Sequence, residues 1–214
     1  MNSHEWDGHY RRERSDLAYP DENLVRLLRK NLPAPDAVTG LRAFDLGCGG
    51  GRHLRLLEEL GISLNTGLER SLNALALARK HTSARLVQGE ITRLPFRNES
   101  ADIVIAWGSL HYSVKGDLPV MLSEITRILS RGGHLFSTLR SARDSHMKRG
   151  THLGDDTWRT GVDDIRGTIA SFYNEDEMRS AFSVFAEFRY GLMERTLIGD
   201  TGALISHWVV HARV

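Results

Sequence analysis

The sequence has only one cysteine, Cys48, among its 214 residues. A single thiol cannot form a disulfide within the chain, so no disulfide framework holds the fold together. The sequence also lacks an apolar run close to the roughly 20 residues that are needed to cross a bilayer. Its first residues, Met1 to Asp7, lack the apolar stretch of a secretory signal. These absences predict a cytoplasmic protein with no membrane partner.

An excess of charge of either sign is lacking as well. Lys and Arg total 28, Asp and Glu total 27, and the formal net charge is +1. This balance gives no electrostatic reason to expect binding to nucleic acid, and basic and aromatic residues are not interleaved as in nucleic-acid platforms. The ten histidines show no His-Glu-x-x-His or other ligand spacing, so we expect no metal site.

Short apolar runs alternate with amphipathic segments through the middle of the chain. The runs predict strands near residues 41–46, 63–69, 84–89, 101–107 and 134–139. The intervening segments predict helices, of which residues 118–129, with Asp117 as a cap, show the clearest apolar stripe. Such alternation implies parallel strands joined by right-handed crossovers, with helices on both faces of an open sheet. In this architecture ligands bind at the carboxyl ends of the strands.

The two ends of the chain differ from this body. A short helix is expected after Pro20, and Pro33 and Pro35 stop it. Residues 141–172 show no clean period, which indicates a long loop or lid. Asn174 and Glu177 have capping-box spacing for a helix, and residues 184–190 and 207–214 are expected to form a final hairpin. The fold predicted is α/β, a Rossmann-like, mostly parallel seven-stranded sheet with an antiparallel C-terminal strand.

The strongest motif lies directly between the first strand and its helix, and reads Asp45-Leu46-Gly47-Cys48-Gly49-Gly50-Gly51. Glycines there allow positive φ angles and a close approach of backbone to ligand. A dinucleotide fingerprint needs its third glycine where Arg52 stands, and no Gly-Lys-Ser/Thr follows for a phosphate loop. An acid two residues before the first glycine suits a cationic amino group better than a pyrophosphate.

This motif resembles motif I of the class I S-adenosylmethionine-dependent methyltransferases. The resemblance continues in order over residues 41–140, through Leu68-Glu69-Arg70, Gly89-Glu90-Ile91, the segment 94–102, Trp107-Gly108-Ser109-Leu110-His111-Tyr112 and the segment 124–133. It implies one domain with a helical cap (1–35), a cofactor-binding core (40–140), a lid or substrate loop (141–173) and a C-terminal helix with a strand hairpin (174–214).

The resemblance implies S-adenosylmethionine as cofactor and S-adenosylhomocysteine as product. Asp45 and the glycine backbone would face the methionine part, Glu69 the ribose hydroxyls and Glu90 the adenine amino group. Tyr10, in an aromatic segment with Trp6, is expected to hydrogen-bond the methionine carboxylate. The expected cofactor-binding residues are Tyr10, Asp45, Leu46, Gly47, Cys48, Gly49, Glu69, Arg70, Gly89, Glu90, Ile91, Trp107 and Gly108.

Methyl transfer from a sulfonium is an in-line displacement, so the protein mainly aligns the reactants and excludes water. A general base is needed only where the acceptor must lose a proton near the transition state. His111 is the candidate base and Tyr112 the residue that orients the acceptor. The alternative is that His111 merely packs beside the cofactor.

The acceptor is expected to be a small molecule, and the chain a monomer or homodimer. His146, His152, Trp158 and Tyr173 are candidate wall residues for the acceptor. Thr157-Trp158, residues 171–178 and His207 to Val210 resemble small bacterial methyltransferases of the tellurite-resistance type. No Asn-Pro-Pro-Tyr-like tetrapeptide follows the fourth strand, which argues against methylation of an amino group on a base or a glutamine.

Two alternatives remain open at this point. One is a regulator that binds S-adenosylmethionine without transferring the methyl group. The other is a nicotinamide-dependent oxidoreductase, against which the missing third fingerprint glycine argues.

Overall fold

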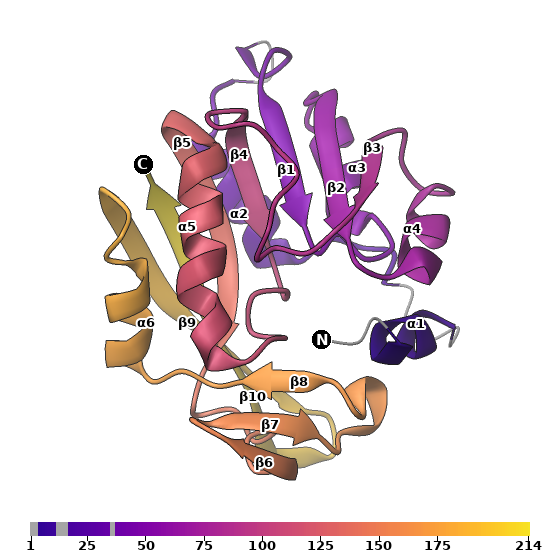
Figure 1. The fold of residues 1–214 in the computed structure, drawn as a ribbon, viewed down its shortest axis with the longest axis vertical. Helices are drawn as coiled ribbons and strands as arrows, with labels where there is room; N and C mark the ends of the chain where they lie inside the picture. The colour runs from indigo at the N-terminus through magenta and orange to yellow at the C-terminus, as the bar shows by residue number, and fades with distance from the viewer. Residues whose placement is uncertain (1–3, 12–16, 35–36) are drawn as a thin grey trace.

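A seven-stranded sheet runs through the centre of the molecule (Figure 1), in the strand order β3-β2-β1-β4-β5-β10-β9. The structure is a computed structural model that describes residues 4–11, 17–34 and 37–214, apart from the side chains of His4 and Asp164. The expected cap over residues 1–35 therefore lies partly outside the described residues, at 1–3, 12–16 and 35. No helix in the described ranges is both long and apolar enough to cross a membrane.

Five strands of this sheet are joined to one another by parallel pairing. They are β1 (Arg42–Leu46), β2 (Leu64–Glu69), β3 (Arg85–Gln88), β4 (Ala101–Ala106) and β5 (Leu129–Arg140). The chain closes with β9 (Glu187–Leu197) and β10 (Asp200–Arg213), and β10 lies antiparallel between β5 and β9. The expected sheet, with its antiparallel C-terminal strand, is confirmed. The final two strands are longer than predicted.

Helices cover both faces of the sheet. On one face lie α2 (Glu22–Asn31) and α3 (Arg52–Glu59), and on the other lie α5 (Leu118–Ile128) and α6 (Glu175–Phe182). The helix α4 (Leu72–Ala78) follows β2, and α1 (His4–Tyr10) packs beside α4. Short 3-10 turns occupy Lys115–Asp117 and Asp163–Ile165. Asp117 precedes α5 as expected, but its side chain makes no capping hydrogen bond.

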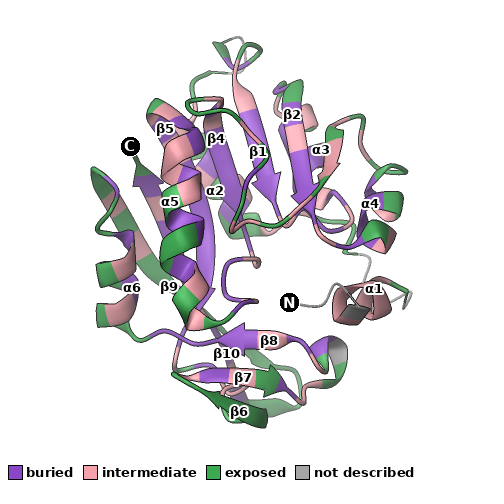
Figure 2. Ribbon diagram, in the orientation of Figure 1, coloured by how far each residue is buried: buried purple, intermediate pink, exposed green. Residues whose placement is uncertain are grey.

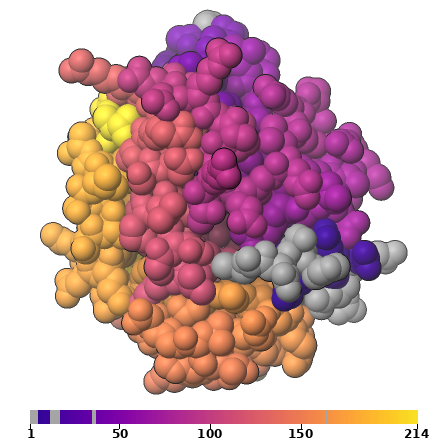
Figure 3. Space-filling view, viewed as in Figure 1, coloured from indigo at the N-terminus to yellow at the C-terminus, as the bar shows by residue number. Residues whose placement is uncertain are grey.

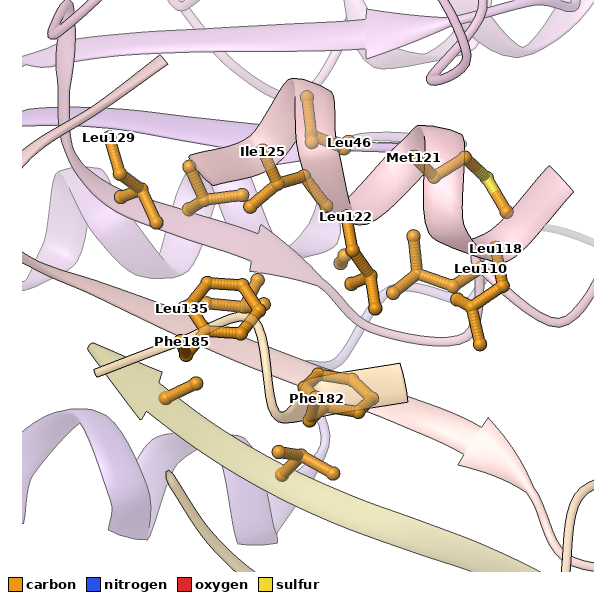
Figure 4. Close-up of a cluster of buried hydrophobic side chains, with 14 of the residues drawn as sticks. Leu46, Leu110, Leu118, Met121, Leu122, Ile125, Leu129, Leu135, Phe182 and Phe185 are labelled. Carbon is orange, nitrogen blue, oxygen red and sulfur yellow. The ribbon is translucent and has the colours of Figure 1, made fainter. Parts of the chain in front are cut away.

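The core consists of two layers, one on each side of the sheet (Figure 2). Leu24 and Leu28 of α2 and Leu54 of α3 are fully buried against one face. Figure 4 shows the other layer, in which the stripe of α5 that the sequence predicts packs with Phe182 and Phe185 against the sheet. Both faces are covered, and β4 is accordingly apolar and buried from Ile103 to Ala106, after Asp102 near its start.

The expected loop over residues 141–172 is wrong, because this segment contains a second sheet. Its three antiparallel strands are β6 (Gly150–Gly154), β7 (Thr157–Thr160) and β8 (Ile169–Ser171). A two-residue turn, Asp155-Asp156, joins β6 to β7 with φ angles of 47° and 45°. Positive φ at both central residues is the geometry of a tight hairpin turn, which usually contains glycine or asparagine. An Asp-Asp pair and a wholly exposed β6 gave no alternation from which to predict the strands.

This small sheet is inserted between β5 and α6, and its two ends meet. The backbone N–H of Tyr173 donates to the carbonyl of Arg140 at 2.9 Å, and that of Ala142 donates to the carbonyl of Tyr173 at 2.9 Å. Figure 1 shows the sheet beneath the carboxyl ends of the parallel strands, and the space-filling view shows its surface against the core (Figure 3). The insertion thus faces the end of the sheet where ligands of this fold bind.

Candidate functional site

A pocket lies at the carboxyl ends of β1, β2, β3 and β4, beneath α1. The space between its lining atoms is about 490 Å³, open solvent at its mouth included. Its lining contains eight of the thirteen expected cofactor-binding residues: Tyr10, Gly47, Glu69, Arg70, Gly89, Glu90, Ile91 and Gly108. Tyr112 lines the pocket too. The remaining lining residues are Trp6, Leu68 and Ser109.

The glycine loop after β1 leaves no room for side chains. Gly47 and Gly49 have φ angles of +80° and +52°, which side chains rarely adopt. A Cβ atom on Gly47 would lie 2.6 Å from the Cβ of Ser109, and one on Gly49 would overlap the hydroxyl of Tyr10. Glycine is therefore required both by backbone conformation and by space.

Glu69 ends β2 and is held by the backbone. Its Oε1 accepts hydrogen bonds from the N–H groups of Arg70 at 2.8 Å and Ser71 at 2.9 Å, and its Oε2 accepts from Gly49 at 3.1 Å. Burial raises the pKa of Glu69, and these three hydrogen bonds oppose the rise. A carboxylate offers about four acceptor positions, so the side chain is fixed in place with one position left for a ligand.

Asp45 does not line the pocket. Its side chain is 1% exposed beneath the glycine loop, and neither carboxylate oxygen has a hydrogen-bond partner among the described residues. The nearest cationic candidate is His53, whose Nδ1 lies 3.8 Å from Asp45 Oδ2, but burial lowers the pKa of His53 to about 3. Burial raises the pKa of Asp45 to about 7, with Arg52 opposing and Glu69 adding to the rise.

Four other expected residues form the wall behind the pocket. Leu46, Cys48 and Trp107 are buried, and Gly49 touches Tyr10 rather than the cavity. Cys48 Sγ lies so close to Gly67 that a Cβ there would approach it to 2.7 Å. Burial and the neighbouring carboxylates of Asp45 and Glu69 raise the pKa of the Cys48 thiol, which disfavours the nucleophilic thiolate.

The helix α1 forms a roof over the pocket. Trp6 meets Tyr112 edge to face, with ring centroids 4.9 Å apart, and the Tyr10 hydroxyl lies against Gly49. Asp7 ties this roof to α4, because Ser71 Oγ donates to Asp7 Oδ1 at 2.6 Å. Trp6, which was expected with Tyr10 in an aromatic segment over the cofactor, lines the pocket. Tyr10 lies beside the glycine loop, and its expected hydrogen bond to the methionine carboxylate stays a prediction.

His111 lies outside the pocket lining and is fully buried. Its Nδ1 is 3.4 Å from the carbonyl of Thr138, and its own carbonyl accepts from the N–H of Ser171 at 2.8 Å. Burial and the charge of Arg140 lower the pKa of His111 well below its usual range. This environment favours a packing role over that of a base, but His111 packs against the inserted sheet and not beside the pocket as the alternative expected. Tyr112, in contrast, reaches the pocket, and its hydroxyl accepts from Arg140 Nη2 at 3.4 Å.

Sequence analysis did not single out two residues of the pocket lining. Leu68 and Ser109 are neighbours of expected residues, Glu69 and Gly108, so adjacency alone was the available signal. The expected wall residues of the lid, His146, His152, Trp158 and Tyr173, do not line the pocket. The rings of Trp158 and His152 pack together instead, 4.6 Å apart. Within the described residues no three His, Cys, Asp or Glu side chains are grouped to hold a metal.

Part of the chain matches a known family. Residues 44–137 match the family model described as "Methyltransferase domain". The malonyl-[acyl-carrier protein] O-methyltransferase of Pectobacterium atrosepticum is 33% identical over 58% of this chain and 49% of its own length. A phthiotriol/phenolphthiotriol dimycocerosates methyltransferase of Mycobacterium leprae is 33% identical over 46% of this chain and 37% of its own. The chain thus spans about half or less of these relatives.

Solved structures share the fold. A SAM-dependent methyltransferase from Methanosarcina mazei superposes with a TM-score of 0.69 at 18% identity, over 87% of this chain and 96% of that one. The magnesium protoporphyrin IX methyltransferase of Synechocystis, solved with bound SAM, gives 0.62 at 17% identity over 90% and 77%. At these identities the likeness establishes the fold. The tellurite-resistance resemblance stays a prediction.

Proposed function

We propose that this chain, whose residues 44–137 match a methyltransferase family model and whose fold is shared with SAM-dependent methyltransferases, transfers a methyl group from S-adenosylmethionine to a small-molecule acceptor. The observation that carries the proposal is the pocket at the strand ends. It brings the glycine loop, Glu69 and Glu90 together under one aromatic roof. The acceptor and the activity of the whole protein are part of the proposal.

The residues of the pocket fit this cofactor. Gly47 and Gly49 leave backbone exposed where a side chain would collide, and Glu69 keeps one acceptor position for a ribose hydroxyl. Asp45 supplies an unpaired carboxylate beneath the loop, whose negative charge favours a cationic amino group above it. Glu90 and Ile91 line the side where the adenine is expected.

The bound cofactor supplies a methyl group already activated on a positively charged sulfur. The protein's contribution is then alignment and exclusion of water. Trp6 and Tyr10 cover the pocket, and Tyr112 offers a hydroxyl at its wall, held by Arg140. The burial of His111 leaves no described imidazole at the pocket lining, so the proposal uses no histidine base.

Glu69→Gln tests the proposal. The carboxylate of Glu69 accepts hydrogen bonds from the backbone N–H groups of Gly49, Arg70 and Ser71. The amide of the variant has no negative charge, and its NH₂ group cannot accept from these N–H groups. Loss of a hydrogen bond to a charged group is worth about 1.5–3 kcal/mol, so affinity for S-adenosylhomocysteine should fall about 10- to 100-fold. Calorimetric titration measures it. Glu59→Gln, at an exposed residue of α3, is the matched control and should bind as the wild type does.

Turnover needs a separate measurement. A screen of hydroxyl, thiol, amine and carbon acceptors should reveal methyl transfer by the wild-type protein. S-adenosylhomocysteine binding with no transfer to any acceptor class would instead support the non-catalytic regulator. Binding of NAD in place of S-adenosylhomocysteine would contradict the proposal and support the oxidoreductase.

A further inference from the structure

A second chamber adjoins the cofactor pocket between α1 and the inserted sheet. The space between its lining atoms is about 570 Å³, open solvent at its mouth included, and it is lined by Glu5, Trp6, Arg70, Arg159, Gly167, Thr168 and Ile169. Trp6 and Arg70 line both cavities and form the shared wall. A molecule in the second chamber would therefore lie next to the cofactor without occupying the cofactor's own place.

The pairing of the inserted strands presents Arg159 to this chamber. Arg159 on β7 stands opposite Ile169 on β8, and opposed residues of an antiparallel pair share one face of the sheet. Both residues line the chamber. Trp158, the next residue along β7, points to the other face, where its ring packs with His152.

The chamber has more positive than negative charge. Arg70 and Arg159 bring two guanidinium groups, and Glu5 brings one carboxylate. Glu5 Oε1 lies 3.8 Å from Arg159 Nη1, too far for a hydrogen bond. The Nη1 of Arg70 is buried and has no hydrogen-bond partner among the described residues. A buried donor on a charged group without an acceptor is costly, and a ligand oxygen would remove that cost.

We propose that the second chamber binds a carboxylate or phosphate group of the methyl acceptor, through Arg70 and Arg159. A guanidinium group recognises both anions by paired N–H donors. The inference rests on the proposed function and narrows its acceptor to an anionic molecule. The acceptor's nucleophilic atom lies at the shared wall, next to Trp6 and Arg70.

Methyl transfer at the shared wall needs no further reactant. A bond forms between the acceptor atom and the methyl carbon while the carbon–sulfur bond breaks, and its electron pair stays on sulfur. Where the acceptor atom carries a proton, the proton leaves to solvent. The anion in the second chamber takes no part in bond making, and positions the acceptor.

Binding of simple anions to the complex with S-adenosylhomocysteine tests the inference without turnover. Malonate and inorganic phosphate are titrated separately into this complex by calorimetry or NMR, and neutral malonamide serves as the uncharged comparison. We expect malonate, phosphate or both to bind and malonamide not to bind. The two anion arms separate a carboxylate site from a phosphate site, and either result supports the chamber.

Two charge-removing variants at the chamber should change affinity in opposite directions. Arg159→Gln removes a cation and should weaken anion binding about 10-fold, whereas Glu5→Gln removes a competing carboxylate and should strengthen it about 3-fold. If Glu5 and Arg159 served only as an ion pair between α1 and the sheet, both variants would weaken binding. Arg149→Gln removes the same charge from an exposed residue beside β6, outside the chamber lining, and should have no effect.

The outcomes separate this inference from the proposed function. Normal binding of S-adenosylhomocysteine with no binding of either anion would overturn the inference alone. Equal effects of Arg159→Gln and Arg149→Gln, or effects of the same sign for Arg159→Gln and Glu5→Gln, would overturn it too. Failure of the wild-type protein to bind S-adenosylhomocysteine would overturn the proposed function. Affinity of each variant for S-adenosylhomocysteine also shows that the variant is folded.

Discussion

Asp45 is a buried acid whose carboxylate has no hydrogen bond among the described residues to offset the cost of its burial. It stands under the glycine loop, fully enclosed, with two carboxylate oxygens that lack hydrogen-bond partners in the described structure. An acid in such surroundings resists ionisation, and its pKa rises to about 7 from the usual value near 4. In an unfolded chain the same carboxyl ionises freely.

This difference makes the stability of the ligand-free protein depend on pH. Between about pH 4 and pH 7 the native Asp45 holds a proton that the unfolded chain has lost, so native stability falls as pH rises through this window. Asp45→Asn abolishes the effect. A shift of one pKa unit corresponds to about 1.4 kcal/mol. We therefore expect the difference in free energy of unfolding, Asp45→Asn minus wild type, to be about 2–3 kcal/mol larger at pH 8 than at pH 5. Urea unfolding without ligand at both pH values measures it.

Asp102 provides the opposite case for comparison. A hydrogen-bonded ion pair with Arg42 holds the pKa of Asp102 well below its usual range. Asp102→Asn should therefore destabilise the protein by similar amounts at pH 5 and pH 8. Identical pH dependence in wild type and Asp45→Asn would contradict the account of Asp45.

The sequence predicted the pocket residues that carry their own chemical signal. Glycines with positive φ and acids at strand ends stand out in a sequence, and Gly47, Glu69 and Glu90 do line the pocket. The burial of His111 could not be predicted, because it depends on β10 and the inserted sheet packing around it. His111 and Tyr112 are adjacent in sequence, yet His111 faces the core and Tyr112 faces the pocket.

At the scale of elements, packing determines what the sequence could predict. The stripe of α5 and the capping box of α6 are repeated or paired signals within a few residues, and both are present in the structure. The strands β6–β8 are short and partly exposed, so no alternation marks them. The inserted sheet forms because its strands pair with each other under the core, which local sequence does not encode.

Substitution of Phe182 measures how much the packing of α6 on the sheet contributes to stability. Its side chain is fully buried, with the rings of Phe185 and Phe188 nearby at 5.9 and 6.3 Å between centroids. Phe182→Ala should lower the free energy of unfolding by about 3–5 kcal/mol, because it leaves a cavity in the core. Ser180→Ala, at an exposed position of the same helix, should cost far less. A loss below about 1 kcal/mol would show that α6 contributes little to the core.

For the whole molecule, the cofactor pocket joins parts that are far apart in the chain. The roof helix, the ends of four strands and Tyr112 all meet there, so a ligand that binds them together should stabilise the native state as a unit. S-adenosylhomocysteine at 100 times its dissociation constant adds about 2.7 kcal/mol. For a chain of this size that corresponds to a rise in Tm of roughly 5–10 °C.

Thermal unfolding with and without S-adenosylhomocysteine measures the rise. Glu69→Gln should show a smaller rise at the same ligand concentration, and NAD should produce none. An unchanged Tm for the wild-type protein at saturating ligand would contradict a binding pocket at the strand ends.

The hydrogen bonds between Arg140, Ala142 and Tyr173 have a consequence for protein engineering. Because the chain leaves the core at Arg140 and returns at Tyr173 beside it, the segment between them is a module closed at its base. A replacement segment needs equally close ends, and it must also retain the contacts of the native segment with His111 and β10. If the proposed function holds, a graft of the corresponding segment from another methyltransferase of this fold should change the acceptor preference and leave the affinity for S-adenosylhomocysteine unchanged.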